Sequence, residues 1–177
     1  MAKKVISIGL SAKEINRAIK ELEKYKQEFV EKVNLLRKRL AEEIGGTAQM
    51  LFDSSGVDDA LRGGTRQADV SVTVADSGDV TLVIADGEDA VWCEFGSGVY
   101  HNGSVGSSPN PYGSDLGLTI GSYGKGFGKN NVWGYYTDPG DKTSLVLTHG
   151  TPATMPLYNA VQSVVPRVVE IAREVFK

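Results

Sequence analysis

The chain has 177 residues, of which 41% are hydrophobic and 23% are charged, and its formal net charge is −3. This composition is typical of a globular protein and excludes global disorder, a collagen-like fibre and a membrane-embedded chain. One cysteine and two histidines exclude an internal disulfide and a histidine-rich metal site. Because the sequence shows neither a signal-peptide pattern nor an apolar run of membrane-spanning length, we expect the chain to fold in a cytoplasm.

Charge is distributed unevenly along the chain. Residues 1–44 contain eleven Lys and Arg against seven Glu, a net charge of +4, which leaves −7 on residues 45–177. Ten acids but only two arginines lie between Asp53 and Glu94. An acidic block of this kind is a poor surface for gripping nucleic acid, whereas the basic segment reads best as the solvated face of a helix.

Residues 11–44 are predicted to form one long helix. Apolar residues recur at a spacing of seven: Ile15, Leu22, Phe29 and Leu36. Ser11 is the expected N-cap, and Gly45-Gly46 is expected to end the helix. A helix of this length measures about 50 Å, so it either overhangs its own sheet or packs on a partner. Of a coiled coil and packing across a sheet, we favour the second, because four heptads lie near the minimum for a coiled coil.

A period of two replaces the helical period after residue 69. Val70, Val72 and Val74 alternate with small or polar residues, and a second alternating run covers residues 80–85 after a turn at 76–79. This pattern predicts a half-buried antiparallel β-hairpin. Residues 90–95, between Asp89 and Gly96, fit a short helix or a strand equally well in length.

The remaining elements lie around a long irregular segment. Residues 97–141 are predicted to be a loop rich in Gly and aromatic residues, with a mobile middle at about 102–130 and ordered ends. Ser144–Thr148 is predicted to be a strand, and a C-terminal helix is expected from Thr151-Pro152 onward. Pro166 lies inside the apolar stripe of that helix, so we expect a kink or a new helix start there.

Together these elements predict a single α+β domain over residues 1–177. Its parts are the long N-terminal helix (1–46), the hairpin and the motif after it (66–96), the Gly/aromatic loop (97–141), and a strand with a C-terminal helix (144–177). We expect an antiparallel sheet, made of the hairpin plus one or two further strands, flanked by the two helices.

No catalytic, cofactor or metal site can be assembled from the sequence. The glycine-rich run Gly121–Gly128 lacks the Lys-Ser/Thr end and the following helix of a phosphate-binding loop. His149 reads as a hydrogen-bonded loop residue, and Cys93 as a small core residue beside an acid. We therefore expect a protein that is not an enzyme. Two alternatives stay open: a ligand-binding module that uses the Tyr/Trp/Gly-rich loop, and a hydrolase-type enzyme that uses His149 with Glu94.

Two short motifs resemble those of a bacteriophage family. Trp92–Gly98 (WCEFGSG) is similar to the V-E-F-G-T-G signature of tail-completion, or head–tail joining, proteins of long-tailed phages, which are neck or minor tail components. Thr148–Ala160 is similar to the family's T-x-G-x-P-A-x-P-hydrophobic-x-x-A motif, with Thr154 where Arg is common. The order of helix, hairpin, first motif, glycine-rich loop with a Trp-Gly-Tyr segment, and second motif also resembles that family.

The resemblance implies a structural protein of the virion that forms a ring, expected to be six-fold, around the DNA channel between head and tail. Its partners would be further copies of itself and neighbouring head-connector or tail proteins, with genomic DNA only passing through and no membrane. It would be located in the virion, and in the host cytoplasm during assembly. The residues expected at subunit or partner interfaces are Glu94, Phe95, Gly96, Gly98, Tyr100, Trp133, Tyr135, His149, Gly150, Pro152 and Pro156.

Physical chemistry adds two expectations to this resemblance. Glu94 precedes a sharp backbone turn and could accept backbone N–H groups of a neighbouring loop, its own or another subunit's. An acidic lumen would let DNA pass without sticking, so Asp76, Asp79 and Asp86 are candidates to face the channel. The competing interpretation is that these acids only form turns.

Overall fold

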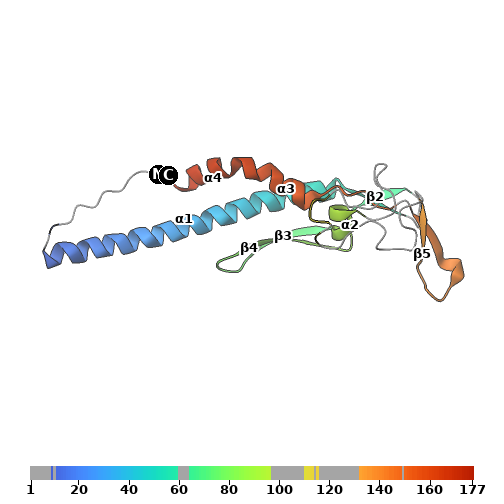
Figure 1. Ribbon diagram of the computed structural model, residues 1–177, viewed down its shortest axis with the longest axis horizontal. Helices are drawn as coiled ribbons and strands as arrows, with labels where there is room; N and C mark the ends of the chain where they lie inside the picture. The colour runs from blue at the N-terminus through green and yellow to red at the C-terminus, as the bar shows by residue number, and fades with distance from the viewer. Residues whose placement is uncertain are drawn as a thin grey trace.

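The longest element of the computed structural model is helix α1, Ala12–Asp53, which runs along most of the molecule (Figure 1). The structure describes Gly9 and residues 11–59, 64–96, 110–113, 115, 132–148 and 150–177. Ser11 is the N-cap of α1, as predicted, and its hydroxyl accepts a hydrogen bond from the Glu14 N–H at 3.3 Å. The α+β class predicted from the sequence is confirmed.

The prediction that Gly45-Gly46 ends the first helix is wrong, because α1 continues for seven residues beyond Gly46. Gly45 is buried against the hairpin, where a Cβ atom would lie 2.9 Å from Cγ2 of Val74. Gly45 therefore allows the helix and the hairpin to approach closely, because it has no side chain. This role does not require the helix to end there. The extension brings Phe52, a fully buried side chain, into the core.

This arrangement predicts opposite outcomes at two neighbouring glycines. Gly46 has no atom within 4 Å of an added Cβ, so Gly46→Ala should stabilise the protein by about 0.5–1 kcal/mol through helix propensity. Gly45→Leu should destabilise it by about 2 kcal/mol, because the side chain would push the hairpin off α1. Gly46→Leu is the matched control in chemical denaturation. Equal midpoints for the two leucine variants would contradict the close approach.

Strands β3 (Ser71–Asp76) and β4 (Thr81–Asp86) form the predicted antiparallel hairpin, with Val72 opposite Ala85 and Val74 opposite Val83. These four residues share one face, and Val72, Val74 and Val83 line the place of Gly45 on α1. Leu82 and Ile84 lie on the opposite face and remain 48% and 42% exposed. The larger apolar side chains of the hairpin therefore lie on the face away from α1, while Val74 on the near face is itself 40% exposed.

The expected sheet of three or four strands is not formed by the described residues. They build three separate two-stranded antiparallel sheets: β3–β4, β1 (Gly56–Asp58) with β2 (Thr65–Gln67), and β5 (Trp133–Tyr136) with β6 (Leu145–Thr148). Strand β5 lies within the predicted loop. It pairs closely with β6 because Gly134 leaves room for Leu145, whose Cδ1 would lie 2.8 Å from a Cβ there. Apart from 110–113 and 115, the rest of that loop up to residue 131, including its expected mobile middle, lies outside the described residues.

The C-terminal helix begins at Pro156, and not at Thr151-Pro152 as predicted. Residues 151–155 stay non-helical because the N–H groups of Thr154 and Met155 both donate to the Cys93 carbonyl. Helix α3 (Pro156–Val164), the 3₁₀ turn η2 (Val165–Arg167) and α4 (Val168–Val175) follow each other. The interruption predicted at Pro166 is confirmed by this turn.

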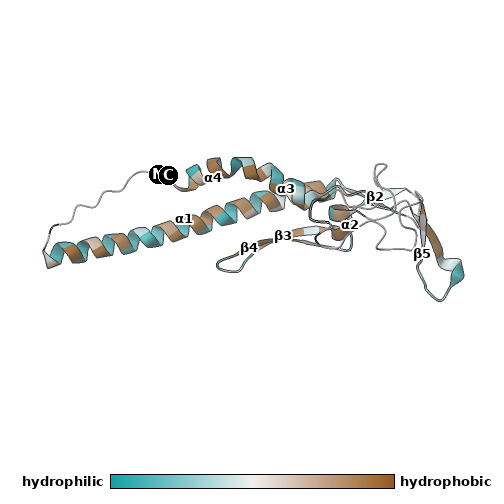
Figure 2. Ribbon diagram, in the orientation of Figure 1, coloured by the Kyte–Doolittle hydropathy of each residue, from teal (hydrophilic) through white to brown (hydrophobic). Residues whose placement is uncertain are grey.

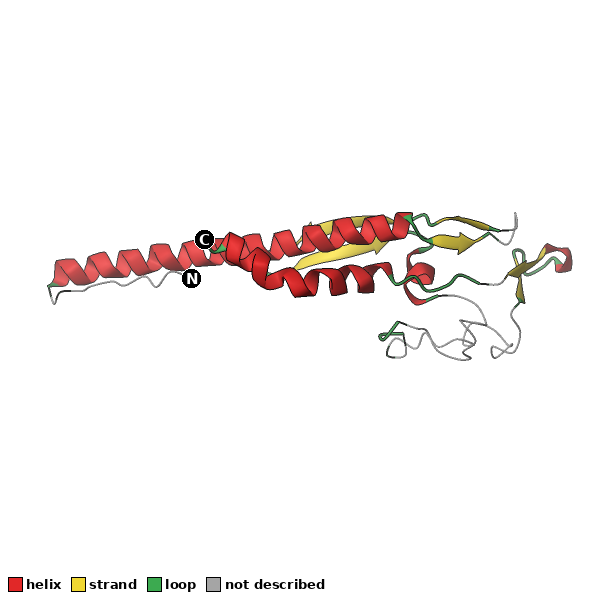
Figure 3. Cartoon of the chain, turned by 90° about the horizontal axis from the view of Figure 1, so that it is seen from above, coloured by secondary structure: helices red, strands yellow, loops and turns green. Residues whose placement is uncertain are grey.

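The C-terminal half of α1 lies between the β3–β4 hairpin and the α3–α4 helices, giving a three-layered body (Figures 1 and 3). Salt bridges from Arg167 to Glu43 (2.8 Å) and from Arg39 to Glu174 (3.4 Å) join the helices. The core consists of Phe52, Val57, Val70, Ala90 and Cys93, with Leu157 packed against it.

The N-terminal half of α1 projects past the end of α4 (Figure 1). The ring centroids of Phe29 and Phe176 lie 5.7 Å apart, which marks where the C-terminal helices end along α1. Apolar positions continue beyond this point along the helix (Figure 2), and Ile15, Ile19 and Leu22 are all more than 40% exposed. The helix thus overhangs its own body, which is one of the two outcomes that its length predicts.

Candidate functional site

The first of the two phage-like motifs folds as a short helix. Helix α2 spans Ala90–Phe95, so the helical alternative for this segment is correct. Gly96 follows with φ 79° and ψ 157°, an extended conformation with positive φ that favours glycine. Cys93 and Glu94 are buried, and Phe95 and Gly96 are half-buried.

Glu94 turns its side chain toward the start of α3. One carboxylate oxygen accepts the Leu157 N–H at 2.8 Å, and the other accepts the Tyr158 N–H at 3.1 Å. The side-chain amide of Asn110 donates to the same carboxylate at 2.8 Å. The first N–H groups of a helix have no partner inside it, and a carboxylate there also favours the helix dipole. Glu94 therefore caps α3 within its own chain.

The two motifs, more than fifty residues apart in sequence, are joined at this point. The Cys93 carbonyl accepts the N–H groups of Thr154 (2.9 Å) and Met155 (3.0 Å). The Thr154 hydroxyl also shares a hydrogen bond of 2.7 Å with Ser55 at the end of α1. Met155 holds a left-handed backbone, φ 54°, where it N-caps α3. A strained non-glycine residue persists only where its surroundings fix it, as this junction does.

An ion pair between the buried Asp89 and the partly exposed Arg66 supports α2 from the other side. Asp89, which is 3% exposed, receives two hydrogen bonds from Arg66 (2.6 and 2.9 Å) and one from the Asp69 N–H (2.8 Å). Burial alone would raise the pKa of Asp89, but Arg66 and the backbone N–H outweigh it and lower the pKa. The same hydrogen bond raises the pKa of Arg66. Asp89 holds the N-cap position of α2, but its carboxylate makes no capping hydrogen bond and pairs with Arg66.

Cys93 is fully buried, as expected of a core residue. Burial, with the nearby charges of Asp89 and Glu94, raises the pKa of its thiol to about 11. Since the thiolate is the reactive form, native protein at pH 8 should react with a thiol reagent at least about 100-fold more slowly than unfolded protein. Reagent absorbance with and without denaturant measures this. Native reaction as fast as the unfolded one would contradict a closed α2–α3 junction.

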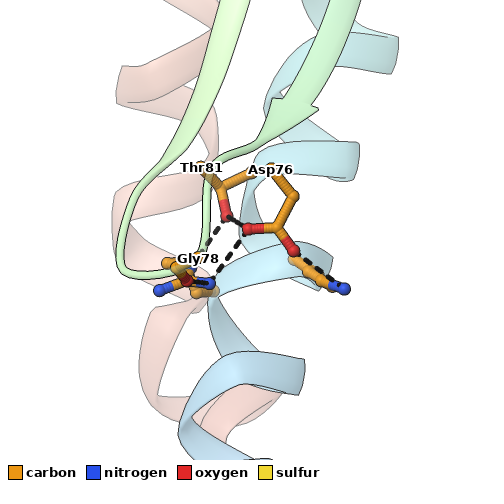
Figure 4. Close-up of polar contacts among 5 residues, drawn as sticks. Asp76, Gly78 and Thr81 are labelled. Carbon is orange, nitrogen blue, oxygen red and sulfur yellow. Dashed lines mark hydrogen bonds and ion pairs between the residues drawn. The ribbon is translucent and has the colours of Figure 1, made fainter.

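The tip of the hairpin is fastened to α1 by charged contacts (Figure 4). Asp76 pairs with Lys38 at 2.8 Å and with Arg37 at 3.0 Å, and Arg37 also donates to the Thr81 hydroxyl at 2.8 Å and to the Gly78 carbonyl. The hydrogen bond from Lys38, with the charge of Arg37, lowers the pKa of Asp76. Asp76 therefore joins the turn to the helix, whereas Asp79 and Asp86 form no ion pair within the described residues.

The structure separates the other expected interface residues into several groups. Pro156 is fully buried at the start of α3, Pro152 is exposed, and Gly150 adopts φ 80°. Trp133 and Tyr135 lie in strand β5, at the end of the molecule opposite the overhang of α1 (Figure 1). Gly98, Tyr100 and His149 lie outside the described residues.

The β5–β6 hairpin carries a second group of exposed apolar side chains. Tyr136, Leu145 and Leu147 are each about half exposed or more, and Tyr135 is 38% exposed. In the register of the two strands, Tyr136 lies opposite Leu145, and Gly134 lies opposite Leu147. A two-stranded sheet with open apolar side chains has little intrinsic stability, so this arm is suited to packing against another surface.

Sequence reasoning missed Arg37, Lys38, Arg66 and Asn110. Arg66 had a signal, because it is one of only two cations within the acidic block. Arg37 and Lys38 had no such signal, because the pattern of a helix does not show which of its charged residues contact a hairpin tip about forty residues further along the chain. Asn110 lies in a segment with no periodicity, so its contact with Glu94 could be found only in three dimensions.

Comparison of the chain with protein-family models, with curated proteins and with solved structures finds no match. None of the helices in the described part of the chain has the length and apolarity needed to cross a bilayer. Among the same residues, His, Cys, Asp and Glu side chains nowhere gather in a group of three or more that could hold a metal ion. The candidate site is the junction of α2 with the start of α3, which Glu94 and the Cys93 carbonyl hold together.

Proposed function

We propose that this chain is a structural assembly protein of a phage virion, which completes the tail or joins head and tail as a ring around the DNA channel. The observation that carries the proposal is the junction at Glu94. The two segments that resemble the phage family contact each other there through Glu94, Cys93 and the start of α3. A resemblance carried by two segments is more informative when they build one local structure than when they lie apart.

The distribution of apolar surface also supports assembly. Large apolar side chains are exposed at both ends of the elongated molecule, on the overhang of α1 and on the β5–β6 arm. Exposed apolar patches of this kind mark surfaces that become covered by partners. A subunit placed between a head connector and a tail would need contacts at both ends, and further contacts with its neighbours in the ring.

The contacts of Glu94 weigh against the hydrolase alternative. A general base must be within reach of substrate, but Glu94 is 6% exposed and its carboxylate already accepts three hydrogen bonds from the chain itself. The ligand-binding alternative rests on the Gly/aromatic loop, which lies mainly outside the described residues.

The contacts of Asp76 make it the weakest of the three acids proposed to face the DNA channel. Its charge is balanced by Arg37 and Lys38, so Asp76 adds little to repulsion of DNA. Asp79, in the turn between β3 and β4, is the better candidate among the three acids. Replacing it by Lys leaves the Asp76 contacts in place, so it changes the charge of the tip without releasing the hairpin.

Deletion of the gene in the phage or prophage that encodes this chain tests the function. We expect filled heads and separate or unfinished tails in electron micrographs, with infectivity restored by supplying the chain in trans. A deletion strain that yields joined, infectious particles at the normal titre would contradict the proposal.

A further inference from the structure

The outer face of the β3–β4 hairpin, on the side away from α1, carries large exposed apolar side chains. By the register of the two strands, this face carries Leu82, Ile84 and Asp86 on β4, opposite Ala75, Thr73 and Ser71 on β3. Leu82 and Ile84 are larger than the residues that the hairpin turns toward α1, and they are 48% and 42% exposed, against 40% for Val74 on the inner face. An antiparallel sheet commonly keeps one face in solvent, so two large aliphatic side chains exposed on that face mark it as a candidate contact surface.

The overhang of α1 also carries an exposed row of apolar side chains. Ile15, Ile19, Leu22 and Phe29 follow each other at spacings of four, three and seven residues, so they lie on one helix face. Lys26 occupies the same row between Leu22 and Phe29, and it forms no ion pair within the described residues. The other cations of this segment, such as Lys20, lie on the opposite side of the helix at 100° per residue.

The row on the helix and the row on the hairpin are similar in length, have the same order of apolar and charged residues, and end in opposite charges. Ile19, Leu22 and Lys26 place two apolar side chains and a cation along about 10 Å of helix. Leu82, Ile84 and Asp86 place two apolar side chains and an anion along about 13 Å of strand. No Lys or Arg occurs between residues 67 and 89, so the hairpin supplies no cation of its own to Asp86.

We propose that the overhanging half of α1 in one copy of the chain docks on the outer hairpin face of a second copy, with Lys26 against Asp86. The hairpin then lies between two helices, its own α1 on the inner face and the neighbour's α1 on the outer face. This contact rests on the proposed self-assembly and names the surfaces that carry it. It also explains why α1 is longer than the body that it supports.

Charge exchange tests the contact. Lys26→Glu and Asp86→Lys should each weaken self-association at least about ten-fold, because each places like charges together. The double variant should recover to within about three-fold of the original chain. Lys20→Glu, on the opposite helix face, is the matched control and should have no effect. Sedimentation over a wide concentration range measures association, and circular dichroism verifies folding of each variant. Single variants that behave like Lys20→Glu, or a double variant that shows no recovery, would overturn the contact.

Cross-linking identifies the surfaces directly and detects weak association. Leu22→Cys and Ile84→Cys variants, mixed under mild oxidation, should form a disulfide-linked dimer that neither forms alone, while the buried Cys93 stays unreactive. A dimer from Leu22→Cys alone would show that two helices pack stripe to stripe and would overturn the proposal. A cross-link that forms only after removal of residues 1–8 would also overturn it, because that segment would then cover the stripe.

The proposed contact between α1 and the hairpin can fail while the proposed assembly function stands. If rings form and enter tails, but the charge variants leave both unchanged, the contact is wrong and the proposed function stands. If the chain neither associates nor enters tails, the proposed function fails and the contact fails with it.

Discussion

Replacing Glu94 by Ala is expected to destabilise the protein by about 3 kcal/mol. The substitution removes the acceptor of the Leu157 and Tyr158 N–H groups and leaves the Asn110 amide without its carboxylate. Hydrogen bonds to a charged group contribute about 1.5–3 kcal/mol each, and their sum is reduced because water can reach the half-buried start of α3. Chemical denaturation at neutral pH measures the loss.

Two further variants separate the cap from general packing. Asn110→Ala removes one donor and keeps the cap, so it should cost about 1 kcal/mol. Glu94→Gln keeps the shape and one acceptor oxygen, so it should lie between the two. If Glu94→Ala costs no more than Asn110→Ala, the carboxylate does not hold the two motifs together.

Arg66→Ala is expected to destabilise the protein by about 2 kcal/mol. It leaves the carboxylate of Asp89, which is 3% exposed, without its cation. Breaking a fully buried ion pair costs about 3–5 kcal/mol, and the Arg66 side chain is 42% exposed, so solvent screening reduces the cost. The double variant Arg66→Ala/Asp89→Asn should be more stable than Arg66→Ala alone, because it removes the unpaired charge.

The same pair predicts a dependence on pH. Because the pKa of Asp89 is lowered in the folded protein, its pair contributes fully at pH values above the unfolded pKa of about 3.9. The contribution is lost as pH falls through the folded pKa. Unfolding curves should therefore show the original chain and Arg66→Ala converging below about pH 4. A difference that stays constant from pH 7 to pH 3 would contradict the assignment.

Local patterns predicted those elements whose signals are local. The stripe from Ile15 onward predicted the helix, alternating valines predicted the hairpin, and Pro166 predicted the interruption near the C-terminus. The end of α1 was predicted too early because Gly45 makes room for Val74, a residue of another element, and does not end the helix. A glycine that permits close approach and one that ends a helix look the same in sequence.

The candidate site shows the same limit. Glu94 was expected to accept backbone N–H groups, and it does so. The sequence did not show that its partners are the first N–H groups of α3 in its own chain. Nor did it show that Arg66 pairs with Asp89, because both contacts join segments that are distant in sequence. The exposed positions of Leu82 and Ile84 were likewise hidden, because alternation does not tell which of two apolar sets faces the helix.

Electron microscopy of the purified chain, alone and mixed with phage tails, tests the central claim most directly. We expect closed rings that appear with the tails or at high protein concentration, seated at the end of the tail that receives the head. Lys26→Glu should reduce their number, and Lys20→Glu should not. Single, unassociated molecules at every concentration, with bare tail ends in the mixture, would contradict the account of this chain as a ring-forming assembly protein.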